Sequence, residues 1–180
     1  MCRFIRFWPI AALCGWVALA AILGATPATA ATPTTANDLV RSDPATLDAL
    51  YAAGNVRVPS GFLPGRAIYK PGTRQAVPAS RLIHPLWQGK IFNDDGTGKN
   101  RLFGLLTAVP TKVYVGESWR DGNPAVIFDY ADSWKMFRKV RDEFREVSPG
   151  LFLGLTYLRN CPEPELAMRF ALQERDACGR

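Results

Sequence analysis

Short apolar stretches separated by glycine and proline dominate the chain from about residue 60 onward. They are rich in β-branched and aromatic residues, and turn sequences such as Asp94-Asp95-Gly96 and Ser148-Pro149-Gly150 lie between them. The pattern predicts strands at 62–69, 86–92, 102–108, 113–119, 125–130, 151–158 and 166–172. Short strands with little helix between them are typical of an antiparallel barrel or sandwich. Glycines within the strand runs favour the more tightly curved barrel.

One short helix is expected ahead of these strands. Asp43 is a suitable N-cap, and Pro44 suits the first helical position. Leu47 and Tyr51 then fall on one face, and Gly54 ends the helix.

The segment from residue 132 to residue 147 has two interpretations. Its apolar residues recur at helical spacing with charges between them, which by periodicity alone predicts an amphipathic helix. The alternative is a short second helix near 133–139, followed by a strand at 140–147. That strand would form a hairpin with strand 151–158 through Ser148-Pro149-Gly150.

The first 30 residues have the pattern of an export signal. Arg3 and Arg6 precede an apolar run at 10–24, and Ala28-Thr29-Ala30 is a small-x-small cleavage site. The run is shorter than the roughly 20 apolar residues of a membrane-spanning helix, although an uncleaved anchor is the alternative. We therefore expect a signal peptide (1–30) cleaved near Ala30, a flexible lead-in (31–42) and a single β-barrel domain (43–180). The mature protein would be periplasmic or secreted, without a transmembrane span.

Composition narrows the classes of partner and cofactor. The formal net charge of the 180 residues is +6, and it falls to +4 without Arg3 and Arg6, too little to indicate nucleic-acid binding in the absence of a recognition motif. Cys161 and Cys178 are the two cysteines of the mature chain, and in an oxidising compartment they are expected to form a disulfide worth about 3 kcal/mol. With His84 as the single histidine, no metal site is expected, and no cofactor is indicated. We expect a monomer or a weak dimer.

A run of alternating charges lies between residues 141 and 146. On a strand, Arg141, Glu143 and Arg145 would share one face and Asp142 the other. A face that lines a barrel could bind a polar headgroup, or its carboxylates could do acid/base chemistry because burial raises their pKa. The same residues could instead form a solvated, ion-paired surface.

Aromatic residues on the predicted strands would either fill the barrel or line a cavity for one small ligand. Together with the charged run they give the candidate ligand-binding residues: Trp87, Tyr114, Trp119, Asp129, Tyr130, Arg141, Asp142, Glu143, Arg145 and Tyr157. No residue is assigned a catalytic role.

Four segments resemble a family of small uncharacterised proteins similar to lipocalin-like, or calycin-type, β-barrels. They are Gly89-Lys90-x-Phe92, then Ser118-Trp119-x-Asp121-Gly122-x-Pro124, then Asp129-Tyr130, and then Arg141-Asp142-Glu143-x-Arg145-Glu146-Val147-x-Pro149-Gly150-Leu151-x-Leu153-Gly154. The resemblance implies a calycin-type barrel with an internal cavity, and it brings no reaction and no ligand. In the last segment the charged run leads through a turn into an apolar strand, which favours the hairpin. Gly61-Phe62-Leu63 stands where a lipocalin proper has Gly-x-Trp.

The sequence therefore predicts a mainly β fold: an antiparallel lipocalin-like β-barrel with one short N-terminal helix and an open question of a second helix near 133–139. Its expected function is to bind a small amphipathic or lipid-like molecule inside the barrel. One alternative is a histidine-independent enzyme, an isomerase or hydrolase, that uses carboxylates in the barrel. The other is a solid barrel that interacts with partners in the cell envelope.

Overall fold

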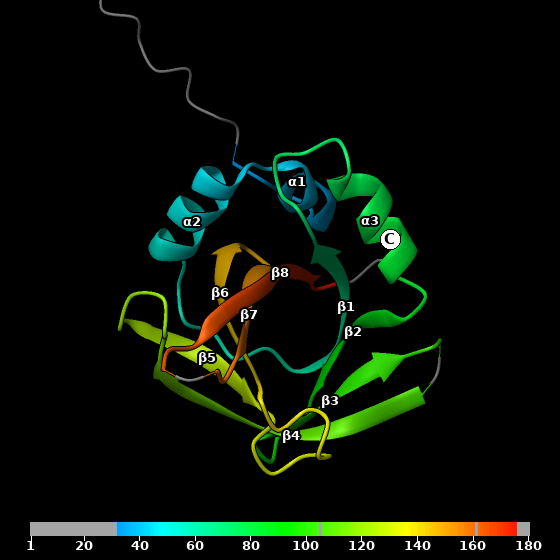
Figure 1. The fold of residues 1–180 in the computed structure, drawn as a ribbon, viewed down its shortest axis with the longest axis vertical. Helices are drawn as coiled ribbons and strands as arrows, with labels where there is room; N and C mark the ends of the chain where they lie inside the picture. Colours follow the sequence, from blue (N-terminus) through cyan, green and yellow to red (C-terminus); the bar gives the residue numbers. More distant parts are fainter. Residues whose placement is uncertain (1–31, 105, 161, 176–180) are drawn as a thin grey trace, which may run out of the picture. The chain divides into compact units, whose positions relative to one another are not determined.

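Eight strands form a closed antiparallel barrel in the computed structural model, which describes residues 32–104, 106–160 and 162–175. Each strand pairs with the next along the chain, and the last strand pairs with the first (Figure 1). The strands are β1 (Gly61–Ile68), β2 (Trp87–Phe92), β3 (Thr97–Leu102), β4 (Leu106–Glu117), β5 (Pro124–Asp129), β6 (Val140–Ser148), β7 (Leu151–Leu158) and β8 (Glu165–Gln173). Closure leaves no unpaired sheet edge in this part of the chain.

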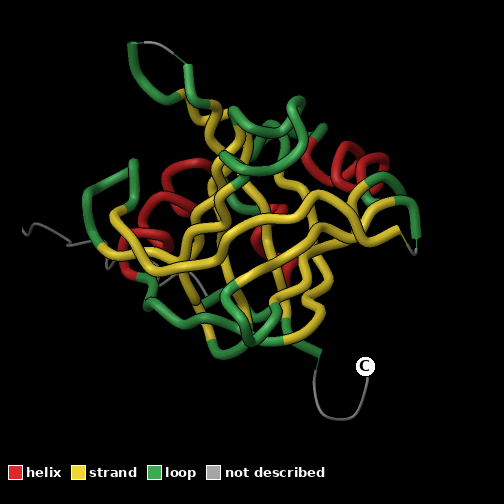
Figure 2. Tube along the Cα trace, turned by 90° about the horizontal axis from the view of Figure 1, so that it is seen from below, coloured by secondary structure: helices red, strands yellow, loops and turns green. Residues whose placement is uncertain are grey.

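Three short helices lie against the outside of the barrel in the described residues: α1 (Ala36–Arg41), α2 (Pro44–Ala53) and α3 (Ala76–Ile83). Figure 2, seen from below, shows them behind the strands. The helix α1 contacts β1, β7 and β8, α2 contacts β6 and β7, and α3 contacts β1 and α1. Among the residues described, no helix has both the length and the apolar character needed to cross a membrane.

Capping explains where the first two helices begin. The Thr35 side chain accepts a hydrogen bond from the Asp38 backbone, and the Asp38 carboxylate accepts one from the Thr35 backbone, which forms a capping box. At the start of α2, Asp43 accepts a hydrogen bond from the Thr46 backbone at 2.9 Å, with Pro44 in the first turn. The predicted helix at this position is confirmed.

The buried apolar residues form two clusters, one inside the barrel and one between its outer face and the helices. The inner cluster is rich in aromatic rings, among them Phe92, Phe128, Phe144, Phe152 and Phe170. The outer cluster joins α1 and α2 to β1, β7 and β8. At one end of the barrel the rings of Phe92, Phe128, Phe144 and Phe152 pack edge to face, and the Arg57 guanidinium lies 4.7 Å from the centre of the Phe152 ring. That end is therefore filled.

Gly154 shows how tightly the interior is packed. A Cβ atom at this position would lie 2.1 Å from the nearest atom of the Phe170 ring, a residue that is 1% exposed. We expect Gly154→Ala to lower the free energy of unfolding by about 1–3 kcal/mol because the ring has little room to move. Urea denaturation measures this effect.

Gly116→Ala is the matched control, because its added Cβ would meet no atom closer than 3.2 Å. Equal unfolding free energies for the two variants would contradict this account of the interior.

The structure confirms the mainly β class and the barrel, and it settles the segment 132–147. Residues 133–139 form turns, so the second helix considered there is absent, and β6 begins at Val140. β6 and β7 form the expected hairpin, with Gly150 in the turn at a φ of 73° that favours glycine.

Four details differ from the prediction. No strand was expected at residues 97–101, which belong to β3, and β4 runs without a break through residues 109–112, where a separation between two strands was expected. The strand expected at 102–108 is interrupted, because Phe103 and Gly104 have φ values of 46° and 87° and reverse the chain between β3 and β4. Part of the expected flexible lead-in forms α1, which is held by the buried Leu39 and Val40. The helix α3 was not predicted, since it has no side-chain cap and is held by packing against α1 and β1.

Candidate ligand-binding site

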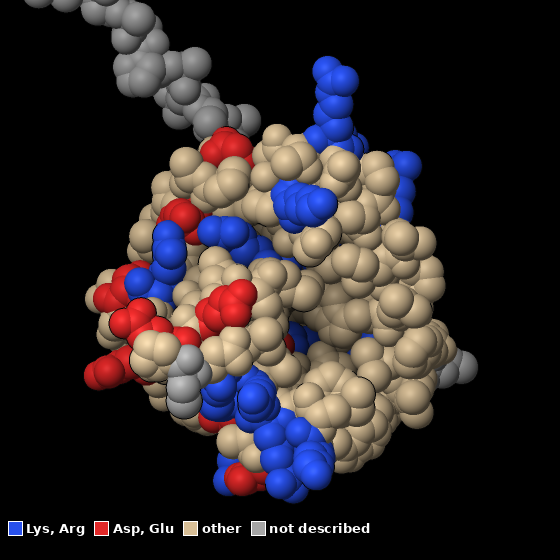
Figure 3. All heavy atoms as spheres, viewed as in Figure 1, with Lys and Arg blue, Asp and Glu red and all other residues tan. Residues whose placement is uncertain are grey.

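A pocket of about 580 Å³ opens at the barrel end opposite the packed phenylalanine rings. Its wall comes from β2, β3, β6, β7 and β8, and its mouth comes from the β3–β4 turn, the segment 130–140 and the residues after α3. Figure 3 shows a hollow near the middle of the visible face, and few charged side chains border it. The volume lies within the range of about 300–1,000 Å³ that is usual for small-molecule sites.

Five side chains form a hydrogen-bonded polar cluster at the inner end of this pocket: Trp87, Lys90, Asn100, Tyr130 and Asp142. The Lys90 ammonium donates to Asp142 Oδ2 at 2.6 Å and to the Tyr130 hydroxyl at 2.8 Å. The Tyr130 hydroxyl donates to the same Oδ2 at 2.9 Å and also accepts from Asn100 Nδ2. Trp87 Nε1 donates to Asn100 Oδ1 at 3.0 Å.

Burial sets the electrostatics of the polar cluster. It lowers the pKa of Lys90, an effect that the neighbouring Asp142 opposes. It also raises the pKa of Tyr130 well above its ordinary value, with a further contribution from Asp142. The Lys90 ammonium lies 4.1 Å from the centre of the Phe128 ring, which gives the cation a second favourable contact. The cluster is thus a compact ion pair within an aromatic wall.

One carboxylate oxygen of the polar cluster has no hydrogen-bond donor in the described residues. Asp142 Oδ1 is buried and accepts no hydrogen bond from any described residue, while Asp142 lines the pocket and is 5% exposed. An unsatisfied buried acceptor costs about 1–3 kcal/mol or more. Asp142 Oδ1 is thus an acceptor without a partner at the pocket wall, which a ligand donor would reach after a small movement of the side chains that cover it.

The mouth of the pocket is apolar and solvent-exposed. Of the large apolar residues exposed in the described chain, five line the pocket: Leu86, Phe103, Leu106, Trp134 and Met136. Met136 alone leaves 78% of its surface in solvent. An apolar rim that continues into an apolar cavity is characteristic of an interaction or ligand-entry surface.

The structure brings three of the sequence-predicted candidates together. Trp87, Tyr130 and Asp142 all belong to the polar cluster and line the pocket. Lys90 and Asn100 were missed. Lys90 and Asn100 are direct neighbours across the β2–β3 pair. Their meeting depends on the register of that pair, which the sequence pattern alone does not give. Lys90 lies two residues before the inward-facing Phe92 on the same strand, so both side chains share one face. This spacing is the signal that could have placed Lys90 inside the barrel.

The other seven candidates do not line the pocket: Tyr114, Trp119, Asp129, Arg141, Glu143, Arg145 and Tyr157. As alternation requires, Arg141, Glu143 and Arg145 point to the face of β6 opposite Asp142, where α2 and the β4–β5 loop cover them. Asp129 accepts hydrogen bonds from Tyr114 and Arg159.

Glu143 is the centre of a second buried network on that outer face. It accepts hydrogen bonds from Ser118 Oγ at 2.5 Å, from the Trp119 backbone at 2.9 Å and from the Tyr51 hydroxyl at 3.2 Å. The Arg141 guanidinium lies 3.2 Å from Glu143 and 4.1 Å from the centre of the Trp119 ring. The Trp119 ring also packs edge to face on Tyr157. These contacts tie α2 and the β4–β5 loop to the barrel.

Two predictions, the signal peptide over residues 1–30 and the disulfide, concern residues that lie outside the described ranges. Cys161 and Cys178, the expected disulfide pair, are not among the described residues, so the pairing stays a prediction. Within the described ranges, no three His, Cys, Asp or Glu residues are grouped so that they could hold a metal ion.

Comparison with known proteins adds little to this picture. No family model matches the chain, and no curated protein matches it. Among solved structures, the chain is similar to a protein from Thermomonospora curvata with 20% identity and a TM-score of 0.47, over 76% of this chain and 90% of that one. A likeness at this level carries no argument about function, and the resemblance to lipocalins and calycins remains an expectation.

Proposed function

We propose that the protein binds one small amphipathic molecule inside the barrel, with its apolar body in the pocket and a hydrogen-bond donor on Asp142 Oδ1. The observation that carries the proposal is a buried acceptor without a partner, in a polar cluster at the inner end of a pocket whose remaining wall is mostly apolar. A bound donor would satisfy Asp142 Oδ1 while displacing water from the surrounding apolar wall.

The charges of the polar cluster indicate the class of the ligand's polar group. Lys90 and Asp142 neutralise each other, so the pocket offers no uncompensated cation for a carboxylate. A carboxylate headgroup would place its negative charge beside Asp142 Oδ1, which is unfavourable at short range in a buried site. A hydroxyl group donates the missing hydrogen bond without adding a charge. The favoured ligand is therefore a long-chain or cyclic alcohol rather than a fatty acid.

The proposal is tested by calorimetric titration of the purified protein with 1-decanol and with decanoate. We expect decanol to bind at least about tenfold more tightly, because one satisfied hydrogen bond to a charged group is worth about 1.5–3 kcal/mol. Thr156→Trp should weaken decanol binding by about tenfold or more, since Thr156 lines the pocket beside Asp142 and Met168 and its larger replacement would occupy the cavity.

Val115→Trp is the matched control, because Val115 is exposed on β4 and does not line the pocket. Equal decanol affinity in the two tryptophan variants would refute binding in the barrel. Tighter binding of decanoate than of decanol would refute the headgroup assignment alone.

The alternatives are less well supported. A mechanism with two carboxylates in the barrel lacks a second acid, since Asp142 is the single carboxylate among the described residues that line the pocket. A solid barrel does not fit a cavity of about 580 Å³. Export through a cleaved signal peptide, ending in the periplasm or outside the cell, remains part of the proposal and is supported by the pattern of the first 30 residues.

A further inference from the structure

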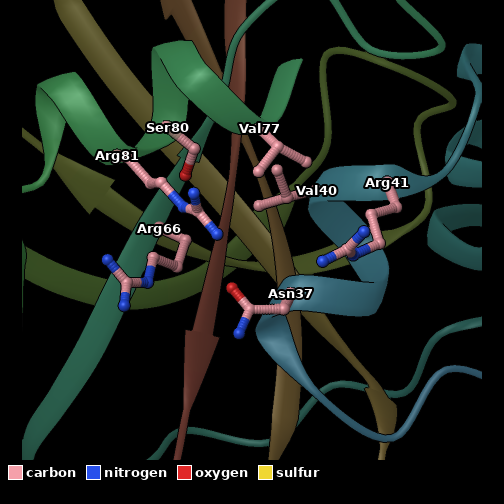
Figure 4. Close-up of a pocket in the computed structure, with 7 residues that line it drawn as sticks. All are labelled: Asn37, Val40, Arg41, Arg66, Val77, Ser80 and Arg81. Atoms are coloured by element: carbon pink, nitrogen blue, oxygen red, sulfur yellow. The ribbon is translucent and has the colours of Figure 1, made fainter. Parts of the chain in front are cut away.

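A second, smaller cavity of about 180 Å³ lies outside the barrel, between α1, α3 and the outer face of β1. Figure 4 shows its lining: Asn37, Val40 and Arg41 from α1, Arg66 from β1, and Val77, Ser80 and Arg81 from α3. Arg41 and Asn37 lie on one side of the space, and Arg81 and Arg66 lie on the other.

The charge of this cavity is not balanced. Arg41, Arg66 and Arg81 all line it, and no carboxylate does. Within residues 32–104, 106–160 and 162–175, none of the three forms an ion pair or a side-chain hydrogen bond. Six other arginines in the described residues contact a carboxylate within 4 Å: Arg57, Arg120, Arg141, Arg145, Arg159 and Arg169. Unlike the three cavity arginines, the remaining arginines of the described chain are dispersed and do not line a common cavity.

The backbone that carries these arginines is held in place. Val40 and Ser80, which flank Arg41 and Arg81 in sequence, are 2% and 3% exposed. The N-terminus of α1 is tied to β8 by a hydrogen bond from the Ala36 backbone to Gln173 Oε1 at 2.9 Å. Arg66 belongs to a barrel strand paired on both sides. The backbones that carry the three arginines are therefore held together without a ligand, while the residues Arg41 and Arg81 are exposed and Arg66 is half-buried.

The pKa of the nearby His84 is affected by burial and by the positive charge of Arg66. The pKa of His84 is lowered, first by its burial and then by the charge of Arg66. No carboxylate lines the cavity beside Arg66, so the residues of the cavity wall do not cancel this positive charge.

We propose that this cavity binds a phosphate group. Guanidinium groups donate paired hydrogen bonds to phosphate oxygens, and a dianion with several oxygens can engage more than one arginine at once. A carboxylate has two oxygens and one charge, and it would leave most of the three arginines unmatched. The Asn37 amide, on the same side of the cavity as Arg41, can donate a further hydrogen bond to the phosphate.

The size of the cavity limits what can bind. Its volume of about 180 Å³ is below the usual range for drug-sized ligands, so it accommodates a headgroup rather than a whole cofactor. The phosphate is either free in solution or the headgroup of a lipid whose chains stay outside. This site is separate from the barrel pocket, and the two proposals stand or fall independently.

The test measures binding of inorganic phosphate and pyrophosphate to the full chain by calorimetry, together with sedimentation of phosphatidic acid vesicles against phosphatidylcholine vesicles. We expect a Kd of about 1 mM or tighter for pyrophosphate. Arg66→Gln and Arg81→Gln should each weaken binding by about tenfold, as expected for loss of one charge-assisted pair. Arg74→Gln is the matched control, since Arg74 is exposed and lies outside the cavity, and it should change the affinity by less than about twofold.

Each outcome decides the matter. Binding of phosphate or pyrophosphate that depends on Arg66 and Arg81 but not on Arg74 supports the site with a soluble ligand. Binding of phosphatidic acid vesicles with the same dependence, without binding of the free anions, supports it with a lipid headgroup. Failure of all three probes, or equal losses in Arg74→Gln and Arg66→Gln, overturns the proposal. Arg81 is exposed, so Arg81→Gln keeps the test valid if Arg66→Gln does not fold.

Discussion

Replacing Asp142 with alanine is expected to lower the free energy of unfolding by about 3–5 kcal/mol, because it leaves the Lys90 ammonium buried without a carboxylate. Lys90 is 1% exposed, and its contact with Asp142 is 2.6 Å. The Tyr130 hydroxyl and Asn100 would remain as neutral partners, which compensate a buried cation only in part.

The double variant Lys90→Met, Asp142→Leu is the control. It replaces both charges with apolar side chains of similar size, and such replacements of buried ion pairs are often neutral or stabilising. Urea denaturation of the wild type, the single variant and the double variant gives the three free energies. The double variant should recover most of the lost stability, and a double variant as unstable as the single one would show that packing, rather than the unpaired cation, is responsible.

The Asp142→Ala variant should also acquire a characteristic pH dependence. Burial lowers the pKa of Lys90 in the folded protein, and without Asp142 nothing of opposite charge opposes this. The unfolded chain then binds more protons than the folded one at pH values between the lowered pKa and the ordinary value near 10.5. The stability of this variant should therefore rise with pH across the window that lies between the lowered pKa of Lys90 and about 10.5.

Arg145→Met is expected to cost about 3 kcal/mol or more, because one buried guanidinium satisfies several groups at once. Arg145 forms a bidentate pair with Asp121, at 2.7 and 2.8 Å, and donates to three backbone carbonyls, those of Tyr51, Asn123 and Pro124. Methionine keeps much of the side-chain volume, so the loss reports mainly on these hydrogen bonds.

Arg120→Met is the matched control, since Arg120 is 44% exposed in its side chain and pairs with Asp48 at the surface. It should change the free energy of unfolding by less than about 1 kcal/mol. Chemical denaturation compares the two. Similar losses for both arginines would contradict a special role for Arg145.

Acid adds a second distinction between Arg145→Met and the wild type. The hydrogen bonds from Arg145 lower the pKa of Asp121 to about 2, from an ordinary value of 3.8. This contribution to stability is fully present above pH 3.8 and is lost as the pH falls through about 2. In Arg145→Met the pKa of Asp121 should return towards its ordinary value, so the stability of this variant should fall less steeply over the same pH range.

The barrel was predictable because local residue types, above all glycine and proline, mark the turns between its strands. Ser148-Pro149-Gly150 places glycine where the β6–β7 turn has a φ of 73°. The helical spacing of residues 134–147 was misleading, because Trp134 and Phe137 belong to a turn segment at the pocket mouth while Phe144 points into the barrel. Tertiary packing, rather than local periodicity, determined the conformation there.

The site could be predicted only in part, and β6 explains why. Its residues from Arg141 to Arg145 are all buried, since one face lines the barrel and the other lies under α2 and the β4–β5 loop. Alternation correctly grouped the charged residues, but nothing in the local pattern says which face is inside. Lys90 joins Asp142 only through the closure of the barrel, which a single sequence does not state.

The order of strand pairing has a consequence for how the protein reaches its native state. Seven of the eight pairings in the described barrel join strands adjacent in sequence, so they close short loops and can form locally. The eighth pairing, between β1 and β8, places Gly65 opposite Leu172. It can form only after the chain has been synthesised as far as β8. Met168 and Phe170 of β8 also line the pocket. During synthesis the cavity therefore cannot exist until the last strand has emerged, and any earlier intermediate presents β1 and β7 as open edges, where aggregation competes with folding.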